Sequence, residues 1–335
     1  MSKDSITDRF DRQARDLRIS VTDRCNFRCR YCMPADVFGP DYQFVPREDI
    51  LSFEEIERLV RIAVPMGIRK IRLTGGEPLL RRGIVQLVRS LSTVEGIEDL
   101  AVTTNGTRLG RNAEDLRAAG LDRVTVSLDA LDPDVFARMN GVGATAGRIV
   151  EGIRKALAAG LGVKVNTVVQ RGVNEGEILP LVRLGRELGV TVRFIEFMDV
   201  GETNRWEMNQ VVPAREVRER IEAEFPLEPV ARSYRGEVAQ RFRFRDGGGE
   251  GGVIASGTEP FCRDCTRLRV SAEGKLFTCL FARQGHDLLG LLRSGESDDA
   301  IRNALAGIWR DRDDRYSEIR GQDSHPKPEM SYLGG

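Results

Sequence analysis

The chain has 335 residues, of which 41% are hydrophobic, and its 51 basic residues balance its 51 acidic residues. Such a chain can form one or two domains with a sizeable core. Zero net charge argues against a molecule whose whole surface binds nucleic acid or a membrane. Residues 1–16 are charged and lack the apolar stretch of a signal peptide, and no run of about 18 apolar residues could span a bilayer. We therefore expect a cytoplasmic protein.

The first two thirds of the chain alternate short apolar runs with amphipathic stretches. We predict strands at Leu17–Val21, Lys70–Thr74, Leu100–Thr104, Arg123–Leu128, Val163–Val169 and Thr191–Phe197. Helical patterns lie near Ser52–Pro65, Gly83–Leu91, Asn112–Ala119, Thr145–Ala159 and Glu175–Leu188. Alternation at a spacing of about 30 residues indicates βα units with parallel strands. We predict an α/β fold in which residues 1–210 form a partial TIM barrel of six units; a doubly wound open sheet is the alternative.

The pattern changes after about residue 210. We predict a helix at Pro213–Phe225, a strand at Arg241–Arg245, a flexible loop at Gly247–Gly252 and helices near Asp287–Arg293 and Asp298–Ile308. Strands at Thr266–Val270 and Lys275–Cys279 are expected to form a hairpin that turns at Glu273 and Gly274. We expect residues 211–320 to form a smaller α+β domain, followed by an aperiodic tail at 321–335.

Three cysteines follow the first predicted strand, where Cys25, Cys29 and Cys32 form the pattern C-x3-C-x2-C. A loop at that place can fold three thiolates around one small object. A [4Fe–4S] cluster usually takes four cysteine ligands, so three ligands leave one iron open to bind a small molecule. A structural zinc site is the alternative, although zinc would need a fourth ligand and no histidine is near in the sequence.

A second group of three cysteines lies in the C-terminal third. Cys262 and Cys265 form the pattern C-x2-C, and the predicted hairpin returns Cys279 beside them. We predict a second [4Fe–4S] cluster with an open iron; a zinc site completed by His286 is the alternative. Together the two groups contain all six cysteines, in a chain expected in a reducing compartment where disulfides are rare.

Two arginines lie on the first strand of this hairpin. Arg267 and Arg269 are two residues apart, so their side chains point to the same face. Two guanidiniums beside a metal site favour an anionic ligand, because arginine binds phosphate oxygens bidentately. The alternative is a strand face that is simply solvated.

The first cysteine pattern resembles the signature of the radical S-adenosylmethionine superfamily. The sequence Gly75-Gly76-Glu77-Pro78 after the second strand is similar to the GGEP motif of that superfamily. The resemblance implies that the open iron binds S-adenosylmethionine, whose reductive cleavage gives a 5′-deoxyadenosyl radical. The residues that it assigns to S-adenosylmethionine are Tyr31, Gly76, Glu77, Ser127 and Met198.

Two groups of three cysteines, the sequence TRLR at 266–269 and a terminal Gly-Gly make the chain similar to the GTP 3′,8-cyclase family from Arg18 to Gly335. This resemblance implies conversion of GTP to (8S)-3′,8-cyclo-7,8-dihydroguanosine 5′-triphosphate, the first step of molybdenum cofactor biosynthesis. It implies that the second cluster binds guanine and that the radical takes hydrogen from ribose C3′. The implied GTP contacts are Arg18, Arg72, Thr103, Lys164, Arg267, Leu268 and Arg269, and the implied catalytic residues are Arg193, Gly334 and Gly335.

The same resemblance implies a set of partners. These are GTP, an electron donor and the downstream cyclic pyranopterin monophosphate synthase, with no nucleic acid and no membrane, for a monomer or a homodimer. It also implies that the Gly-Gly tail reaches into the active site, where we predict Arg193 as its partner.

Two other functions are compatible with parts of the sequence. A peptide-modifying radical maturase with an auxiliary cluster would usually carry more than the three cysteines found here in the C-terminal half. An iron–sulfur electron-transfer protein or a zinc-binding protein would not need a GGEP sequence at a strand end.

Overall fold

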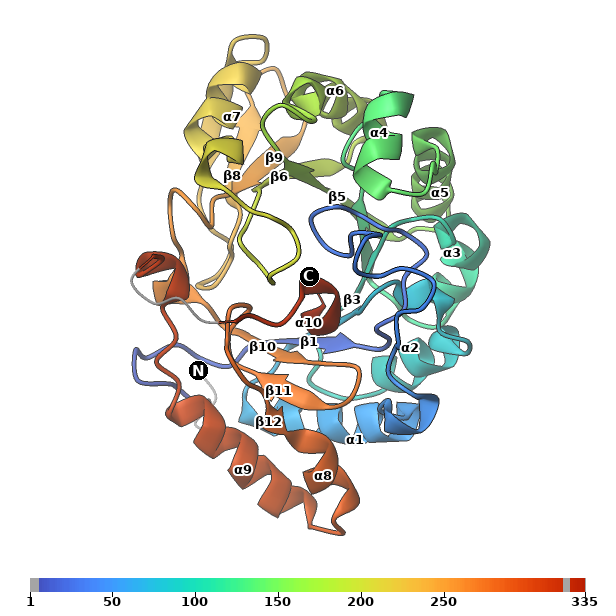
Figure 1. The fold of residues 1–335 in the computed structure, drawn as a ribbon, viewed down its shortest axis with the longest axis vertical. Helices are drawn as coiled ribbons and strands as arrows, with labels where there is room; N and C mark the ends of the chain where they lie inside the picture. Colours follow the sequence, from blue (N-terminus) through green and yellow to red (C-terminus); the bar gives the residue numbers. More distant parts are fainter. Residues whose placement is uncertain (1–5, 322–325, 335) are drawn as a thin grey trace.

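A curved sheet of twelve strands surrounds the centre of the protein, and helices cover its outer face (Figure 1). The computed structural model describes residues 6–321 and 326–334. The strands are β1 (Asp16–Ser20), β2 (Lys70–Thr74), β3 (Asp99–Thr104), β4 (Arg123–Ser127), β5 (Gly162–Val169), β6 (Thr191–Glu196), β7 (Leu227–Val230), β8 (Gln240–Phe244), β9 (Glu250–Ile254), β10 (Arg267–Val270), β11 (Lys275–Phe277) and β12 (His286–Asp287). Their spatial order is β12-β11-β10-β1-β2-β3-β4-β5-β6-β9-β8-β7.

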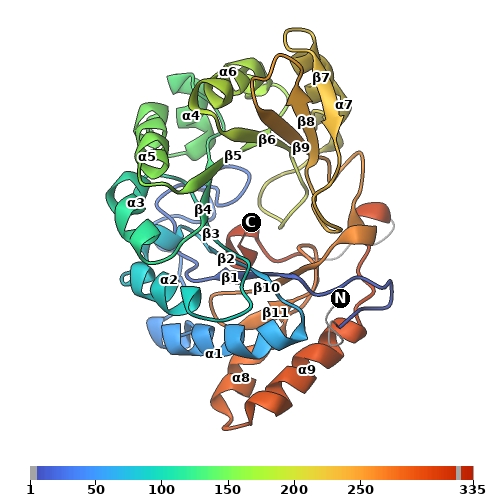
Figure 2. The same cartoon turned by 180° about the vertical axis from the view of Figure 1, so that it is seen from behind.

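The helices lie on the convex side of this sheet, as the reverse view also shows (Figure 2). They are α1 (Phe53–Ala63), α2 (Ile84–Ser92), α3 (Leu109–Ala118), α4 (Pro133–Asn140), α5 (Ala146–Ala158), α6 (Ile178–Leu188), α7 (Ala214–Glu222), α8 (Leu288–Arg293), α9 (Asp298–Arg310) and α10 (Met330–Leu333). The short α10 is an exception, because it lies inside the ring of strands (Figure 1). No helix of the described residues is long and apolar enough to cross a membrane.

The partial barrel predicted from the sequence is confirmed. Each of the six predicted strands of the first two thirds is present, within one residue at either end. Strands β1 to β6 are neighbours in sequence order and all parallel. A doubly wound sheet would reverse its strand order and carry helices on both faces, so that alternative is wrong. Helix α4 was not predicted, because eight residues with few buried apolar positions are too short to establish a period.

The C-terminal third adds strands to both edges of the barrel. Strand β10 pairs in parallel with β1, and β9 pairs in parallel with β6. The flexible loop predicted at Gly247–Gly252 is therefore wrong from Glu250 onward, where β9 begins. Glycine has a packing reason there, since a Cβ on Gly251 would lie 2.5 Å from the ring of Phe242 on β8. Strands from both sides of residue 210 share one sheet, and the division into domains at that residue stays a prediction.

A buried carboxylate joins the barrel to its C-terminal additions. Glu196, at the end of β6, is 1% exposed. Its carboxylate accepts the N–H of Ala214 (2.8 Å), the first residue of α7, and the N–H groups of Gly257 (2.7 Å) and Thr258 (3.0 Å) after β9. It also accepts the hydroxyl of Thr258. One side chain thus fixes three segments at the place where the chain leaves the sixth βα unit.

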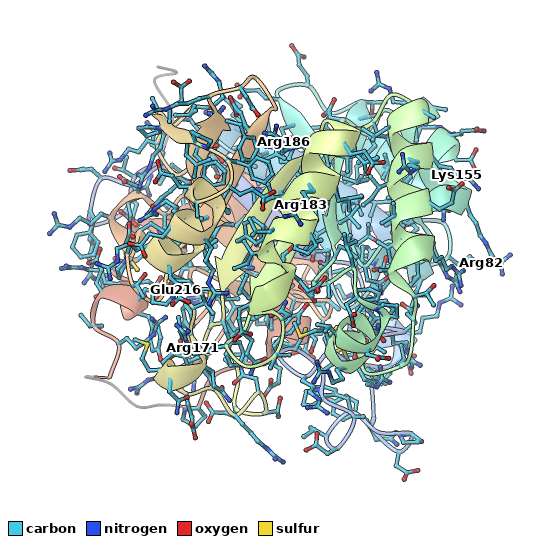
Figure 3. All side chains as sticks on the ribbon, turned by 90° about the horizontal axis from the view of Figure 1, so that it is seen from above. Arg82, Lys155, Arg171, Arg183, Arg186 and Glu216 are labelled. Carbon is cyan, nitrogen blue, oxygen red and sulfur yellow. The ribbon has the colours of Figure 1, made fainter. Side chains whose placement is uncertain are left out.

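Exposed ion pairs connect α7 and the residues after it to neighbouring segments on the outside, where Figure 3 labels Arg171, Arg183 and Glu216. Arg183 on α6 pairs with Glu224 after α7 (2.6 Å), and Arg171 after β5 pairs with Glu216 on α7 (2.5 Å). Because these side chains are exposed to solvent, each pair contributes little to the free energy of unfolding.

We predict that Glu196→Gln lowers the free energy of unfolding by about 1.5–3 kcal/mol, because an amide cannot accept as many hydrogen bonds as the buried carboxylate does. Urea denaturation of the apo-protein measures this change. Glu224→Gln is the matched control and should change stability by less than about 1 kcal/mol. Equal effects of the two substitutions would contradict the role given to Glu196.

Candidate active site

One cavity occupies the middle of the barrel, with about 240 Å³ of space accessible to water. Loops that follow the carboxyl ends of the strands form part of its wall, which is where the active sites of such barrels lie. Both cysteine groups face this cavity, together with most of the predicted substrate and cofactor residues. The predicted residues in its lining are Arg18, Cys25, Cys29, Tyr31, Cys32, Arg72, Gly76, Thr103, Ser127, Arg193, Met198, Cys262, Cys265, Arg267, Arg269 and Cys279.

The GGEP sequence joins the first cysteine loop to the barrel. The N–H of Gly76 donates to Thr22 O (2.7 Å) and that of Glu77 to Arg24 O (2.8 Å). A Cβ on Gly75 would lie 2.2 Å from Thr22 O, and one on Gly76 would lie 2.2 Å from Arg24 O. Both glycines are required because two stretches of backbone approach each other closely here.

The side chain of Glu77 turns away from the cavity and holds the next loop. Its carboxylate is fully buried and accepts the hydroxyl of Thr104 (2.7 Å) and the N–H groups of Asn105 (2.7 Å) and Leu79 (3.0 Å). Burial raises the pKa of Glu77 to about 7, although these hydrogen bonds oppose the rise. Asn105 in turn directs its amide nitrogen at Cys25 Sγ, 3.8 Å away.

The first cysteine loop lies in an apolar and acidic environment. Its three cysteines are free thiols. Burial and the nearby Glu77 raise the pKa of Cys25 to about 11, and burial and Asp129 raise that of Cys29 well above its usual value. The hydroxyl of Tyr31 donates to Asp129 (2.8 Å), whose own pKa burial raises to about 6. Three unpaired thiols facing one cavity fit the ligand set of an open iron–sulfur cluster.

The second cysteine loop has the opposite electrostatic character. Arg267 directs Nε and Nη2 at Cys265 Sγ, each 3.4 Å away. Burial would raise the pKa of Cys265, but the guanidiniums of Arg267 and Arg312 lower it to about 6. His286, the proposed fourth zinc ligand, is exposed on β12, opposite Leu276. In the described ranges 6–321 and 326–334, no three His, Cys, Asp or Glu side chains are placed around a single metal ion.

Arginines gather between the two loops. The parallel register places Arg269, Arg18 and Arg72 side by side on β10, β1 and β2. Burial and the neighbouring Arg269 lower the pKa of Arg18 well below its usual value. Among the described side chains, no carboxylate forms an ion pair with Arg18, Arg72, Arg193, Arg267 or Arg269. Arg193 Nε and Asn166 Oδ1, which also belong to residues of this lining, are buried without a described hydrogen-bond partner.

A second cavity of about 250 Å³ lies at the opposite, amino-terminal ends of the strands. Four arginines of the central cavity, at 18, 72, 193 and 267, also line this one, so the two spaces meet at these side chains. Lys70, Arg123 and Lys164 add further positive charge here. Burial, followed by the nearby Arg193, lowers the pKa of Lys164 to about 8.

The tail enters the centre of the barrel through α10. The carbonyl of Gly334 accepts Arg269 Nη1 (2.6 Å), so Arg269, and not the expected Arg193, contacts this part of the tail. Arg193 instead donates to Thr125 Oγ1 (3.4 Å). Gly334 has φ +69°, and a Cβ there would lie 2.3 Å from Thr74 Cγ2. Gly335 lies outside the described residues.

Three other predicted residues are near the cavities rather than in the lining of the first. Glu77 acts from behind the loop, Lys164 faces the second cavity, and Leu268 packs into the hydrophobic core because its side chain alternates with those of Arg267 and Arg269. The roles that the resemblance gives to all these residues stay predictions.

Sequence reasoning missed several residues of the central cavity. Asn105 and Asp129 line it just after the carboxyl ends of β3 and β4, a position that alone made them candidates. Asn166 also lines it, from the middle of β5. Arg312 and Asp314 also line it, but they follow α9 in a stretch of alternating charges, where no local signal marks them.

The fold and the cysteine loop define a radical S-adenosylmethionine enzyme. The sequence matches the Radical SAM superfamily over residues 19–185 and the Molybdenum Cofactor Synthesis C family over residues 190–318. It is 52% identical to the GTP 3′,8-cyclase of Xanthomonas axonopodis pv. citri and 50% identical to that of Acidothermus cellulolyticus, in each case over 98% of this chain and 99% of the relative. The chain belongs to the GTP 3′,8-cyclase family.

A solved structure shares the fold at low sequence identity. Streptococcus suis SuiB bound to S-adenosylmethionine superposes with a TM-score of 0.64 at 16% identity, over 93% of this chain and 69% of SuiB. This similarity supports the barrel architecture alone.

We predict that Gly334→Ala lowers the rate of GTP conversion at least about tenfold, because the methyl group would meet Thr74 and move the Gly334 carbonyl away from Arg269, removing a contact to a charged group. The thermal midpoint should change little. Gly295→Ala is the control, since Gly295 also has positive φ (+80°) but has open space around its Cβ position. Conversion at the parent rate in Gly334→Ala would contradict this prediction.

Proposed function

We propose that the protein converts GTP to (8S)-3′,8-cyclo-7,8-dihydroguanosine 5′-triphosphate, the first step of molybdenum cofactor biosynthesis. Its cofactors are two [4Fe–4S] clusters and S-adenosylmethionine. Membership of the GTP 3′,8-cyclase family supports this activity, with relatives that match nearly the whole chain at up to 52% identity. A peptide-modifying activity has no comparable support, because SuiB, which has also been solved bound to the precursor peptide SuiA, shares only the fold with this chain.

The observation that carries the proposal is the placement of both cysteine groups and the arginines around one cavity. Cys25, Cys29 and Cys32 would hold the first cluster, and Cys262, Cys265 and Cys279 would hold the second. The first cluster and S-adenosylmethionine, when bound, supply a 5′-deoxyadenosyl radical. A substrate between the two groups of ligands is enclosed by the barrel, which excludes water from a reactive intermediate.

The charges of the chain suit a nucleoside triphosphate in this space. Arg18, Arg72 and Arg193 stand between the two cavities and have no carboxylate partner among the described residues. We propose that they bind the triphosphate together with Lys164 and Arg267, because phosphate oxygens accept charge-assisted hydrogen bonds from guanidinium and ammonium groups. Thr103 already accepts a hydrogen bond from Arg72 (3.0 Å), which orients that guanidinium.

Near the first cysteine loop, we propose that Tyr31, Gly76, Ser127 and Met198 contact S-adenosylmethionine. Tyr31 is fixed by Asp129 and packs with Met139 and Phe197 in a small apolar cluster. Such a surface suits a purine ring.

Other partners are proposed on the family resemblance. An electron donor must reduce the first cluster, and the cyclic pyranopterin monophosphate synthase would consume the product. The cytoplasmic location and the choice between monomer and homodimer stay predictions.

We predict that anaerobically reconstituted protein holds about eight irons and, with S-adenosylmethionine and a reductant, consumes GTP. Replacing Cys25 with Ala should abolish deoxyadenosine formation, because the radical forms at the first cluster. Replacing Cys279 with Ala should preserve some uncoupled deoxyadenosine formation but abolish GTP consumption. Chromatography of both products checks these outcomes; stoichiometric zinc without labile sulfide, or no GTP consumption by fully loaded protein, would refute the proposal.

We predict that GTP binds more weakly to the holoenzyme as the pH rises from 7.5 to 9. The pKa of Lys164 lies at about 8, so its ammonium is charged below that pH and loses its proton above it. Because GTP can still bind the fraction of protein in which Lys164 is protonated, binding should weaken by at most about tenfold at pH 9, one unit above this pKa. Anaerobic calorimetry measures the affinity at each pH.

Lys164→Met should bind GTP weakly at both pH values and remove most of this dependence. The control is Lys155→Met, since Lys155 is an exposed lysine on α5 that pairs with Glu151 (3.6 Å). A pH dependence that survives unchanged in Lys164→Met would assign it to another group.

A further inference from the structure

A buried ion cluster joins the segment before β1 to the residues after α9, next to the second cysteine loop. Asp8 and Arg12 come from the segment before β1, and Arg312 follows α9. The side chains of Asp8 and Arg12 are fully buried, and that of Arg312 is 1% exposed. Asp8 Oδ2 accepts Arg12 Nε (2.6 Å) and Arg312 Nη1 (3.1 Å), so one carboxylate pairs with two guanidiniums.

Both guanidiniums also donate hydrogen bonds to the backbone of the cysteine loop. Arg12 Nη1 donates to the carbonyl of Cys262 (2.8 Å), and Arg312 Nη1 donates to the carbonyl of Cys265 (2.8 Å). The two carbonyls belong to the two ends of the C-x2-C turn. Each ligand of that turn is therefore fixed by a different arginine, and the shared Asp8 sets the distance between them.

Further contacts hold the two arginines of the ion cluster in place. Trp309 Nε1 at the end of α9 donates to Arg12 O (2.9 Å), and the Arg312 guanidinium lies over the Trp309 ring, 4.5 Å from its centroid. Arg12 Nη1 donates in addition to Asp314 O (2.7 Å). Figures 1 and 2 both show the start of the described chain beside α9.

We propose that Asp8, Arg12 and Arg312 are positioning residues for the second iron–sulfur cluster, which they hold through the backbone of Cys262 and Cys265 and whose negative charge they stabilise. The inference rests on the second cluster of the proposed function. The two guanidiniums donate directly to the turn, whereas the carboxylates of Asp8 and Asp314 (3.1 Å from Arg312 Nε) pair with the guanidiniums. Groups that orient the ligands of a metal site, without binding the metal, govern how firmly that site holds it.

Either arginine can be replaced without leaving the buried carboxylate of Asp8 unpaired. In Arg12→Met, Asp8 still pairs with Arg312, and in Arg312→Met it still pairs with Arg12. Removing Asp8 would instead leave the buried guanidinium of Arg12 without its carboxylate, which is strongly destabilising. The two arginine variants therefore test the cluster site one carbonyl at a time.

The test uses full-length protein in which Cys25, Cys29 and Cys32 are replaced by Ala, so that reconstitution loads the second site alone. Iron and labile sulfide content, the electron paramagnetic resonance spectrum and midpoint potential of the reduced cluster, and the rate of cluster loss to a chelator are then measured. Arg12→Met and Arg312→Met should each accelerate that loss about ten- to a hundredfold, the range seen for groups that orient metal ligands. Both should also lower the midpoint potential, because a nearby positive charge is gone.

The matched control is Arg9→Met in the same background. Arg9 lies in the same segment but is 58% exposed and pairs with Asp311 (3.7 Å) and Asp313 (3.6 Å). It should leave cluster loss and midpoint potential unchanged. Arg312→Lys keeps the charge and should restore most of the potential that Arg312→Met loses.

Thermal unfolding of the apo-proteins shows whether each variant is folded. Cluster loss and midpoint potential unchanged in folded Arg12→Met and Arg312→Met would overturn the inference. Failure of the background protein to take up any cluster would instead count against the second cluster, and so against the proposed function. The two failures are thus distinguishable.

Discussion

Arg269, Arg18 and Arg72 stand side by side in the middle of the barrel, because β10 and β2 both pair with β1 in parallel register. Buried guanidiniums without a carboxylate partner are costly, and the described chain supplies none for these three. The Gly334 carbonyl offers Arg269 a neutral acceptor. Substrate phosphates would supply the missing negative charge, so the same three guanidiniums favour an anionic ligand in this cavity.

The barrel and the first cysteine loop could be predicted because their signals are local. Each βα unit shows its own hydrophobic periodicity, and Cys25, Cys29 and Cys32 lie within one short segment, residues 25–32. The GGEP sequence was recognised as a motif, whereas its physical reason needed the structure: backbone at Thr22 and Arg24 occupies the space of two side chains. Strand β9 was missed because its glycines signal a loop, although Gly251 is glycine to admit the ring of Phe242.

The environment of the second cysteine loop could not be predicted in this way. Arg12 donates to a carbonyl 250 residues further along the chain, and Asp8 pairs with Arg312 at a separation of 304 residues. Neither Arg12 nor Arg312 belongs to a motif, since arginine alternates with aspartate around both. Only the pairing of β10 with β1 brings the segment before β1 against this loop. Contacts of this kind depend on the closure of the whole fold.

The two cysteine loops differ most in the charges that surround them. The first is held at the carbonyl of Cys25 by Arg28 (2.9 Å). Burial, with Glu77 near Cys25 and Asp129 near Cys29, raises the pKa of its thiols. The second is held by arginines at both carbonyls, at the sulfur of Cys265, and at Asp264, whose carboxylate accepts Arg232 (2.6 Å) and Arg235 (3.2 Å). Negative charge is therefore disfavoured at the first loop and favoured at the second. Clusters held by these two loops would therefore differ in potential, because nearby charges and hydrogen bonds to the sulfurs tune an iron–sulfur cluster. One fold provides both environments around the same cavity, with Glu77 and Asp129 after β2 and β4 and arginines on β10 and after α9.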